Sequence, residues 1–118
     1  MKKISDNKII RIALVGCGRI SSRHFDSINA HEKKIKLISI CDGNQQVLSK
    51  HEKEYGVKGY LDLKEMLESE KLDLVAICTP SGIHAEQTEL CAKYGVNVMT
   101  EKPMATRWQD GLRMVKVC

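Results

Sequence analysis

The chain has 118 residues, enough for one domain with its own hydrophobic core, and a composition (42% hydrophobic, 29% charged) typical of a soluble globular protein. Its formal charge of +4 comes from 19 basic and 15 acidic residues without a basic stripe interleaved with aromatics, which argues against a nucleic-acid partner. No apolar run is long enough to cross a membrane. We therefore expect a cytoplasmic protein without a nucleic-acid or membrane partner.

The first apolar segment of the chain ends at two closely spaced glycines, Gly16 and Gly18. The charged start Met1–Lys3 resembles that of a signal peptide, but Arg11 interrupts the apolar stretch behind it. We therefore interpret residues 10–15 as a first strand that runs directly into a glycine turn.

A helical pattern follows the glycines, and a second apolar segment, residues 35–41, then ends at Asp42. This order of strand, glycine turn, helix, strand and carboxylate is that of a dinucleotide site. Gly16 would permit the tight turn, and Gly18 would let a pyrophosphate approach the backbone at the helix N-terminus. Asp42 would accept hydrogen bonds from a ribose, and Ser21 replaces the third glycine of the motif. A purely structural tight turn is the alternative.

The rest of the chain alternates strand and helix signals. Strands are predicted near residues 57–60, 74–78 and 96–99, and helices near residues 47–55, 62–68, 84–94 and from 106 onward. The continuous apolar run at 74–78 is typical of a strand buried on both faces of a parallel sheet. The last helix carries on one face Trp108, Leu112, Val115 and Cys118. The alternation predicts an α/β fold, a Rossmann-like doubly wound parallel sheet, with its ligand at the carboxyl ends of the strands.

The five cysteines are an odd number and form no C-x-x-C pair. We interpret them as free thiols that act as small buried hydrophobes in a reducing compartment: Cys17, Cys41, Cys78, Cys91 and Cys118. Cys17 lies between the two glycines, where a reactive thiol is the alternative. We expect no metal site.

Two later loops, at residues 79–84 and 100–103, carry the remaining candidate chemistry, and the second contains the triplet Glu-Lys-Pro. Here the sequence resembles the glucose–fructose oxidoreductase and inositol dehydrogenase family of nicotinamide-dependent sugar oxidoreductases, whose hallmark is this triplet after the fifth strand. The resemblance extends from about Arg11 to Cys118. Residues 79–84 and 98–111 look like one branch of it, which oxidises the 3-hydroxyl of UDP-N-acetylglucosaminuronic acid on the route to bacterial surface polysaccharides.

The resemblance implies a role for each residue of the triplet. Lys102 would reach both the cofactor and the substrate hydroxyl, where its charge favours a developing alkoxide. Glu101 would orient the lysine or the carboxamide of the nicotinamide, and Pro103 is a candidate for a cis bond. His84 would line the nicotinamide pocket, although a simple helix-start histidine is the alternative. In isolation the triplet would be no more than a strand end with solvated charges.

NAD is the expected cofactor, and Lys102 is the expected catalytic residue. The expected cofactor-binding residues are Gly16, Gly18, Arg19, Ile20, Asp42, Thr79, Pro80, His84, Glu101 and Lys102. The other histidines are interpreted as structural or solvated: His24, His31 and His51.

Members of the family continue into a second α/β domain, which holds most sugar contacts and the histidine that accepts the proton. We therefore interpret residues 1–118 as one dinucleotide-binding domain that is incomplete at its C-terminus and inactive alone. The complete protein would be a homo-oligomer that takes a nucleotide sugar or a polyol. The alternatives are a non-catalytic NAD-binding, sensing or interaction module, or a family oxidoreductase that acts on inositol or another sugar. Lys102 favours an enzyme, since sensing needs no lysine at the hydride-transfer point.

Overall fold

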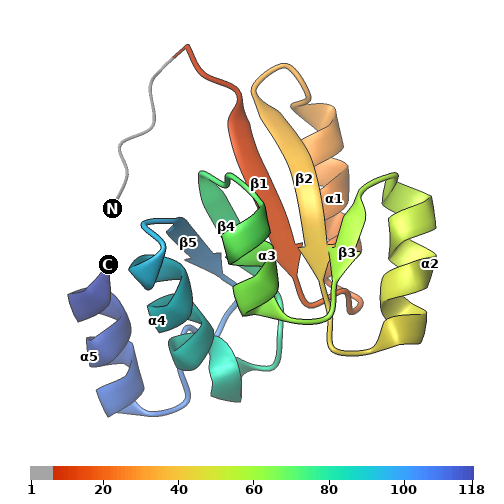
Figure 1. The fold of residues 1–118 in the computed structure, drawn as a ribbon. Coiled ribbons are helices and arrows are strands. Elements are labelled where there is room, and N and C mark those ends of the chain that lie inside the picture. The colour runs from red at the N-terminus through yellow and green to blue at the C-terminus, as the bar shows by residue number, and fades with distance from the viewer. Residues whose placement is uncertain (1–6) are drawn as a thin grey trace.

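A computed structural model describes residues 7–118, so the charged start Met1–Lys3 lies outside the described residues. The chain forms a five-stranded sheet in the order β3-β2-β1-β4-β5, and every pairing is parallel (Figure 1). The strands are β1 (Ile10–Val15), β2 (Ile35–Cys41), β3 (Lys58–Tyr60), β4 (Leu74–Ile77) and β5 (Asn97–Thr100). The helices are α1 (Ser21–Ala30), α2 (Gln45–Tyr55), α3 (Leu63–Ser69), α4 (His84–Lys93) and α5 (Trp108–Val117). The predicted doubly wound parallel sheet is confirmed.

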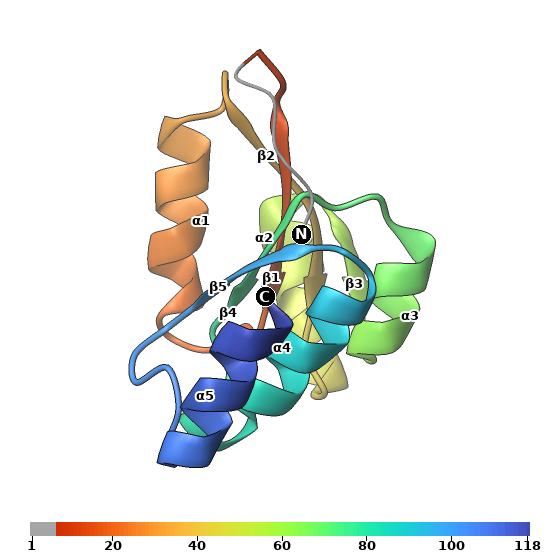
Figure 2. The ribbon, with the colours of Figure 1, turned by 90° about the vertical axis from the view of Figure 1, so that its left-hand side faces the viewer.

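Helices cover both faces of the sheet, and Figure 2 shows α1 on one side of it and α3 on the other. Successive side chains of a strand point to opposite faces, so β1 contributes to two separate cores. One core joins Leu14 of β1 to Ile28 of α1 and Leu48 of α2. The other joins Val15 of β1 to Met66 of α3 and to residues of α4. Burial on both faces is the reason why the strands are nearly continuous apolar runs.

The parallel register aligns the carboxyl ends of the strands at one edge of the sheet. Val15 pairs with Cys41 of β2 and with Ile77 of β4, and Ile77 in turn pairs with Thr100 of β5. The loops that follow these four residues therefore emerge side by side, although they come from distant parts of the chain.

The last helix differs from its prediction in two ways. It begins at Trp108 instead of near residue 106, and its predicted apolar face is exposed to solvent instead of being buried in the core. Trp108 is 77% exposed and Val115 is 70% exposed, whereas Met114 on the opposite face is buried. The helical spacing was correct, but spacing alone does not say which face of a helix meets the core. Within residues 7–118, no helix is long and apolar enough to span a bilayer.

Candidate functional site

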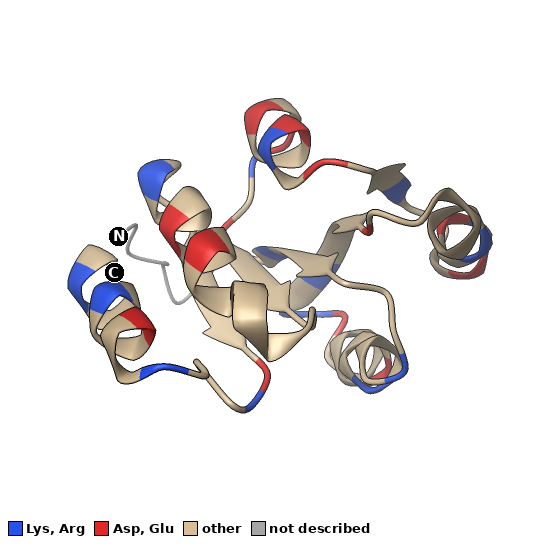
Figure 3. Ribbon diagram, turned by 90° about the horizontal axis from the view of Figure 1, so that it is seen from below, with Lys and Arg blue, Asp and Glu red and all other residues tan. Residues whose placement is uncertain are grey.

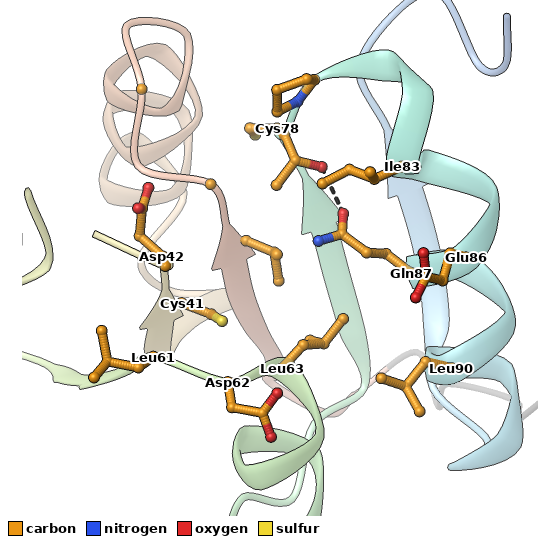
Figure 4. A pocket seen from close by; sticks show the side chains of 16 residues that line it. Cys41, Asp42, Leu61, Asp62, Leu63, Cys78, Ile83, Glu86, Gln87 and Leu90 are labelled. Atoms are coloured by element: carbon orange, nitrogen blue, oxygen red, sulfur yellow. Dashed lines mark hydrogen bonds between the residues drawn. The ribbon is translucent and has the colours of Figure 1, made fainter. Parts of the chain in front are cut away.

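A cleft of about 560 Å³ opens at the carboxyl ends of the strands, the side from which Figure 3 views the molecule. Figure 4 shows the side chains around it, which come from the loops after β1, β2, β3 and β4 and from α3 and α4. Its lining residues are Val15, Gly16, Gly18, Cys41, Asp42, Gly43, Leu61, Asp62, Leu63, Cys78, Thr79, Pro80, Ile83, Glu86, Gln87 and Leu90. The position of the cleft is the one that the doubly wound fold predicts for a ligand.

The two glycines of the turn after β1 differ in backbone conformation and in the space around them. Gly16 has a φ of +89°, and a Cβ added to it would lie 2.8 Å from the backbone nitrogen of Thr79. The fold itself therefore excludes a side chain at this position. Gly18 lacks a positive φ, and a Cβ added to it would meet no atom within 4 Å. The fold itself therefore does not require a glycine at position 18, and the space beside it is open toward the cleft.

The N-terminus of α1 has no side-chain cap, whereas the neighbouring helix α2 has one. At α2, the Asn44 side chain accepts hydrogen bonds from the backbone nitrogens of Gln46 and Val47. At α1, the position before the helix is Ile20, which has no capping group, and the first turn contains no acidic residue. Uncapped amides at the positive end of a helix dipole attract an anion such as a phosphate.

The carboxylate of Asp42 fixes the end of β2 against the glycine turn. One of its oxygens accepts a hydrogen bond of 2.8 Å from the backbone nitrogen of Cys17, and the other accepts one of 2.8 Å from that of Asn44. An ionised carboxylate has about four lone-pair sites, so both oxygens can still accept hydrogen bonds from ribose hydroxyls. Figure 4 shows Asp42 at the rim of the cleft.

Thr79 packs against the glycine turn from the end of β4. Its hydroxyl donates a hydrogen bond to the side-chain oxygen of Gln87 on α4, which is dashed in Figure 4. Sequence analysis did not single out Gln87, because a lone glutamine on a helix carries no motif. The contact ties the loop that contains Thr79 and Pro80, both of which line the cleft, to α4.

The Glu101-Lys102-Pro103 triplet follows β5, and the Lys102–Pro103 peptide bond is cis, which confirms the sequence-based expectation. The Lys102 side chain is exposed, whereas Glu101 is partly buried. The carboxylate of Glu101 contacts the ring of His24 on α1, and this hydrogen bond holds the pKa of Glu101 below its usual range. The interpretation of His24 as structural or solvated missed this contact, since the partners are 77 positions apart.

The side chain of His84 lies between the loop after β4 and the loop after β5 and contacts both. It is only 1% exposed, and its ring nitrogens lie 2.6 Å from the carbonyl oxygen of Thr79 and 3.1 Å from that of Pro103. Its neighbour Ile83 lines the main cleft, whereas His84 lies behind the wall. The imidazole thus fixes the distance between the loop after β4 and the loop after β5.

Three thiols lie near the cleft, of which Cys17 and Cys41 are buried and Cys78 is half-buried, and all three remain protonated at neutral pH. Burial raises the pKa of Cys17 and Cys41 to about 12 and that of Cys78 to about 11. Since the thiolate is the reactive form, these side chains act as small hydrophobes, as expected. Cys91 is likewise buried, but Cys118 is exposed, and there the expectation of burial was wrong. Cys118 follows α5 directly and lines a shallow pocket with Val98 and Thr100 of β5, where its side chain stays accessible to solvent.

The structure thus gathers the predicted site residues into two groups. Those that line the main cleft are Gly16, Gly18, Asp42, Thr79 and Pro80. The others lie outside its lining: Arg19 and Ile20 lead into α1, Glu101 and Lys102 follow β5, and His84 lies behind the wall. Among residues 7–118, no group of side chains has the composition and proximity to bind a metal ion.

Residues 10–118 match a family model described as an oxidoreductase family with an NAD-binding Rossmann fold. The chain is 32% identical to myo-inositol 2-dehydrogenase of Thermotoga maritima over 91% of this chain and 32% of that protein. It therefore spans about a third of the length of the curated relatives that it matches.

Solved structures give a nearer likeness. The WlbA dehydrogenase of Bordetella pertussis, in complex with NADH and UDP-GlcNAcA, is 44% identical, with a TM-score of 0.94 over 98% of this chain and 34% of that chain. The WlbA dehydrogenase of Chromobacterium violaceum, in complex with the same two ligands, is also 44% identical, with a TM-score of 0.92 over 99% of this chain and 34% of that one. The chain belongs to the Gfo/Idh/MocA oxidoreductase family and is an NAD-binding Rossmann domain of that family.

Proposed function

We propose that this domain belongs to an NAD-dependent dehydrogenase that oxidises a sugar hydroxyl, the 3-hydroxyl of a UDP-N-acetyl-hexuronic acid. The observation that carries the proposal is the 44% identity, over almost the whole chain, to two dehydrogenases solved with NADH and UDP-GlcNAcA. The curated inositol dehydrogenases are more distant, at 32% identity or less.

The residues of the cleft suit each part of the cofactor. The uncapped N-terminus of α1 and the open space at Gly18 would hold the pyrophosphate, with the amides of Arg19 and Ile20 close by. Asp42 would hold the adenosine ribose through the lone pairs that its two backbone contacts leave free. The second half of the cofactor would extend past Thr79 and Pro80 toward the loop after β5. When bound, NAD supplies the acceptor for the hydride.

Lys102 is the residue of this chain that we assign to the reacting hydroxyl. Its exposed side chain stands on a loop that is fixed at both neighbours, by Glu101 against α1 and by Pro103 against His84. A positive charge close to the hydroxyl oxygen stabilises negative charge that develops there as the proton leaves, and loss of such a group costs on the order of 10²–10³ in rate. We assign no proton acceptor within this chain.

Three further features belong to the proposal for the complete protein. Residues 1–118 would be an incomplete cofactor domain, and a second α/β domain would supply most sugar contacts and the proton acceptor. The reaction would take place in the cytoplasm, which agrees with five free cysteines among the described residues. We also propose a homo-oligomer, on family resemblance alone.

A panel of candidate substrates tests this function. NADH formation by the full-length protein is followed with UDP-N-acetylglucosaminuronic acid, inositol and glucose, using the wild type, Lys102→Met and the control Lys50→Met. Lys50 is exposed on α2, away from the cleft, so its loss leaves the site unchanged. We expect the nucleotide sugar to be the best substrate and Lys102→Met to lower kcat by about 10² or more.

Three results would contradict the proposal at different levels. Undiminished turnover by Lys102→Met removes the lysine from the mechanism. Activity on inositol alone keeps the family and discards the nucleotide sugar. NADH binding without oxidation of any sugar would favour a non-catalytic module.

A further inference from the structure

His24 belongs to no recognised sequence motif, yet its side chain contacts the loop that carries the Glu-Lys-Pro triplet. It lies on α1, the helix whose N-terminus faces the cleft, and its ring contacts the carboxylate of Glu101 on the loop after β5. Both side chains are largely shielded from solvent, with exposures of 22% for His24 and 27% for Glu101. The contact therefore joins the two halves of the site through one ion pair or hydrogen bond that is only partly accessible to water.

The main chain of Glu101, the first residue of the triplet, is hydrogen-bonded to the end of β4. Its backbone nitrogen donates a hydrogen bond of 2.9 Å to the carbonyl oxygen of Ile77, which anchors it to the end of β4. The main chain and the charge of Lys102, the next residue, also lower the pKa of this carboxyl group. Glu101 is thus held through its side chain by His24 and through its main chain by β4, and Lys102 follows it directly in the chain.

The other end of the triplet has a matching support. The ring of His84 lies 3.1 Å from the carbonyl oxygen of Pro103 and keeps that end at a fixed distance from Thr79. Lys102 stands between these two supports with an exposed side chain. The flanking residues set the direction of its backbone, and the side chain remains free to reach a ligand.

We propose that His24 is a positioning residue that acts through the Glu101 carboxylate to set the direction of Lys102 toward the substrate hydroxyl. The proposal rests on the proposed function, since it assumes that Lys102 meets the reacting group. His24 itself lies outside the lining of the main cleft, so its loss should affect the orientation of the lysine more than the affinity for the cofactor. A misplacement of about 1 Å is enough to lower a rate by about 10²-fold.

Substitutions at His24 separate this role from a merely structural one. His24→Phe keeps a ring of similar shape and removes both nitrogens, whereas His24→Gln retains an N–H donor near the place of Nε2. His31→Leu is the control, because it removes an exposed histidine at the far end of the same helix. In the full-length protein we expect kcat to fall about tenfold or more in His24→Phe and to return to within about threefold of wild type in His24→Gln, with KM for the sugar changing less than kcat.

A second readout uses the 118-residue chain without any turnover. The carboxyl carbon of Glu101 is followed by NMR during a pH titration, and the Kd for NADH is measured on the same variants. We expect the Glu101 pKa to rise in His24→Phe, because the hydrogen bond that lowers it is lost, and to stay low in His31→Leu. The Kd for NADH should change by less than about threefold in every variant.

Each outcome bears on one proposal only. Wild-type kcat in His24→Phe overturns the positioning role, and the proposed function stands if Lys102→Met has lost turnover. Full turnover in Lys102→Met overturns the proposed function, whatever His24 does. If His24→Phe does not fold, His24→Leu gives the same test: an unchanged kcat in that variant overturns the proposal, and a fall of about tenfold with unchanged NADH binding supports it.

Discussion

The loop after β1 and the loop after β5 lie at the same edge of the sheet but are shaped by different forces. The first turns on Gly16, whose positive φ and close approach to Thr79 leave no room for a side chain. The second is held by side chains that arrive from elsewhere, His24 from α1 and His84 from the start of α4. Backbone constraint thus defines one half of the site and side-chain contact defines the other.

From this difference we expect the two loops to respond differently to amino-acid substitution. A substitution of either glycine in the first loop acts on the main chain or on the space directly beside it, so its effect on folding or binding is close to all or none. A substitution at a residue that supports the second loop removes one polar contact. We expect its effect to be graded and to appear mainly in kcat. The variants at His24 and Lys102 described above test the second half, and four expected results test the first, from the largest effect to the smallest.

The largest effect is expected for Gly16→Val. The left-handed backbone disfavours any L side chain, and the added Cβ would lie 2.8–2.9 Å from three atoms of Cys78 and Thr79. We expect a loss of at least about 3 kcal/mol in the free energy of unfolding, a large share of the stability of a domain of this size. Urea unfolding followed by circular dichroism measures it. A variant with wild-type stability would show that backbone constraint does not shape this loop.

Gly18→Val should leave the fold intact and abolish NAD binding. The added side chain meets no protein atom within 4 Å of its Cβ, but it fills the space that we assign to the pyrophosphate. Calorimetric titration with NADH should show at least a 100-fold weaker Kd, about 2.7 kcal/mol, at an unchanged melting temperature. Gly82→Val is the matched control, because its Cβ is equally unobstructed and Gly82 is not part of the cleft lining. Normal binding by Gly18→Val would make the glycine turn purely structural.

Asp42 should set the preference for NAD over NADP. A carboxylate roughly 4 Å from a 2′-phosphate repels it by up to about 4 kcal/mol at an effective dielectric near 20. We expect the wild type to bind NADH at least tenfold more tightly than NADPH, and Asp42→Asn to bring the two Kd values within about threefold. Equal affinities in the wild type would contradict the role of Asp42.

The smallest effect concerns the buried thiol of the first loop. Burial raises the pKa of Cys17 to about 12, whereas an unfolded chain loses the thiol proton near pH 8.5. Above that pH the unfolded state binds fewer protons than the folded state, so stability falls as pH rises. Between pH 8 and 9.5 the wild type should lose about 1 kcal/mol more in the free energy of unfolding than Cys17→Ala. Parallel pH profiles from urea unfolding would indicate that the thiol is not desolvated.

Sequence patterns predicted the first half of the site well because its signals are local. Two glycines after an apolar run, and an aspartate that ends the next such run, are enough to predict a strand, a tight turn and a carboxylate at one edge of a sheet. The tight turn at Gly16 and the position of Asp42 in the cleft follow from that pattern.

The second half was less predictable because its contacts join distant parts of the chain. The triplet after β5 was found through family resemblance, but nothing near His24 in the sequence indicates Glu101, which is 77 positions away. His84 was expected at the cofactor, and the structure places it behind the cleft wall, where it bridges two carbonyl oxygens. Periodicity also failed to orient α5, since its more apolar face is the exposed one.

The most direct test of the account is to map the cofactor on the described chain. NADH is titrated into the ¹⁵N-labelled protein, and the backbone amide signals are followed. The account predicts saturable shifts at residues 16–20, 42–43, 79–80 and 101–103, with little change at the amino ends of the strands. Saturable shifts confined to another face, or no binding at all, would contradict the claim that the loops after β1 and β5 form one NAD site.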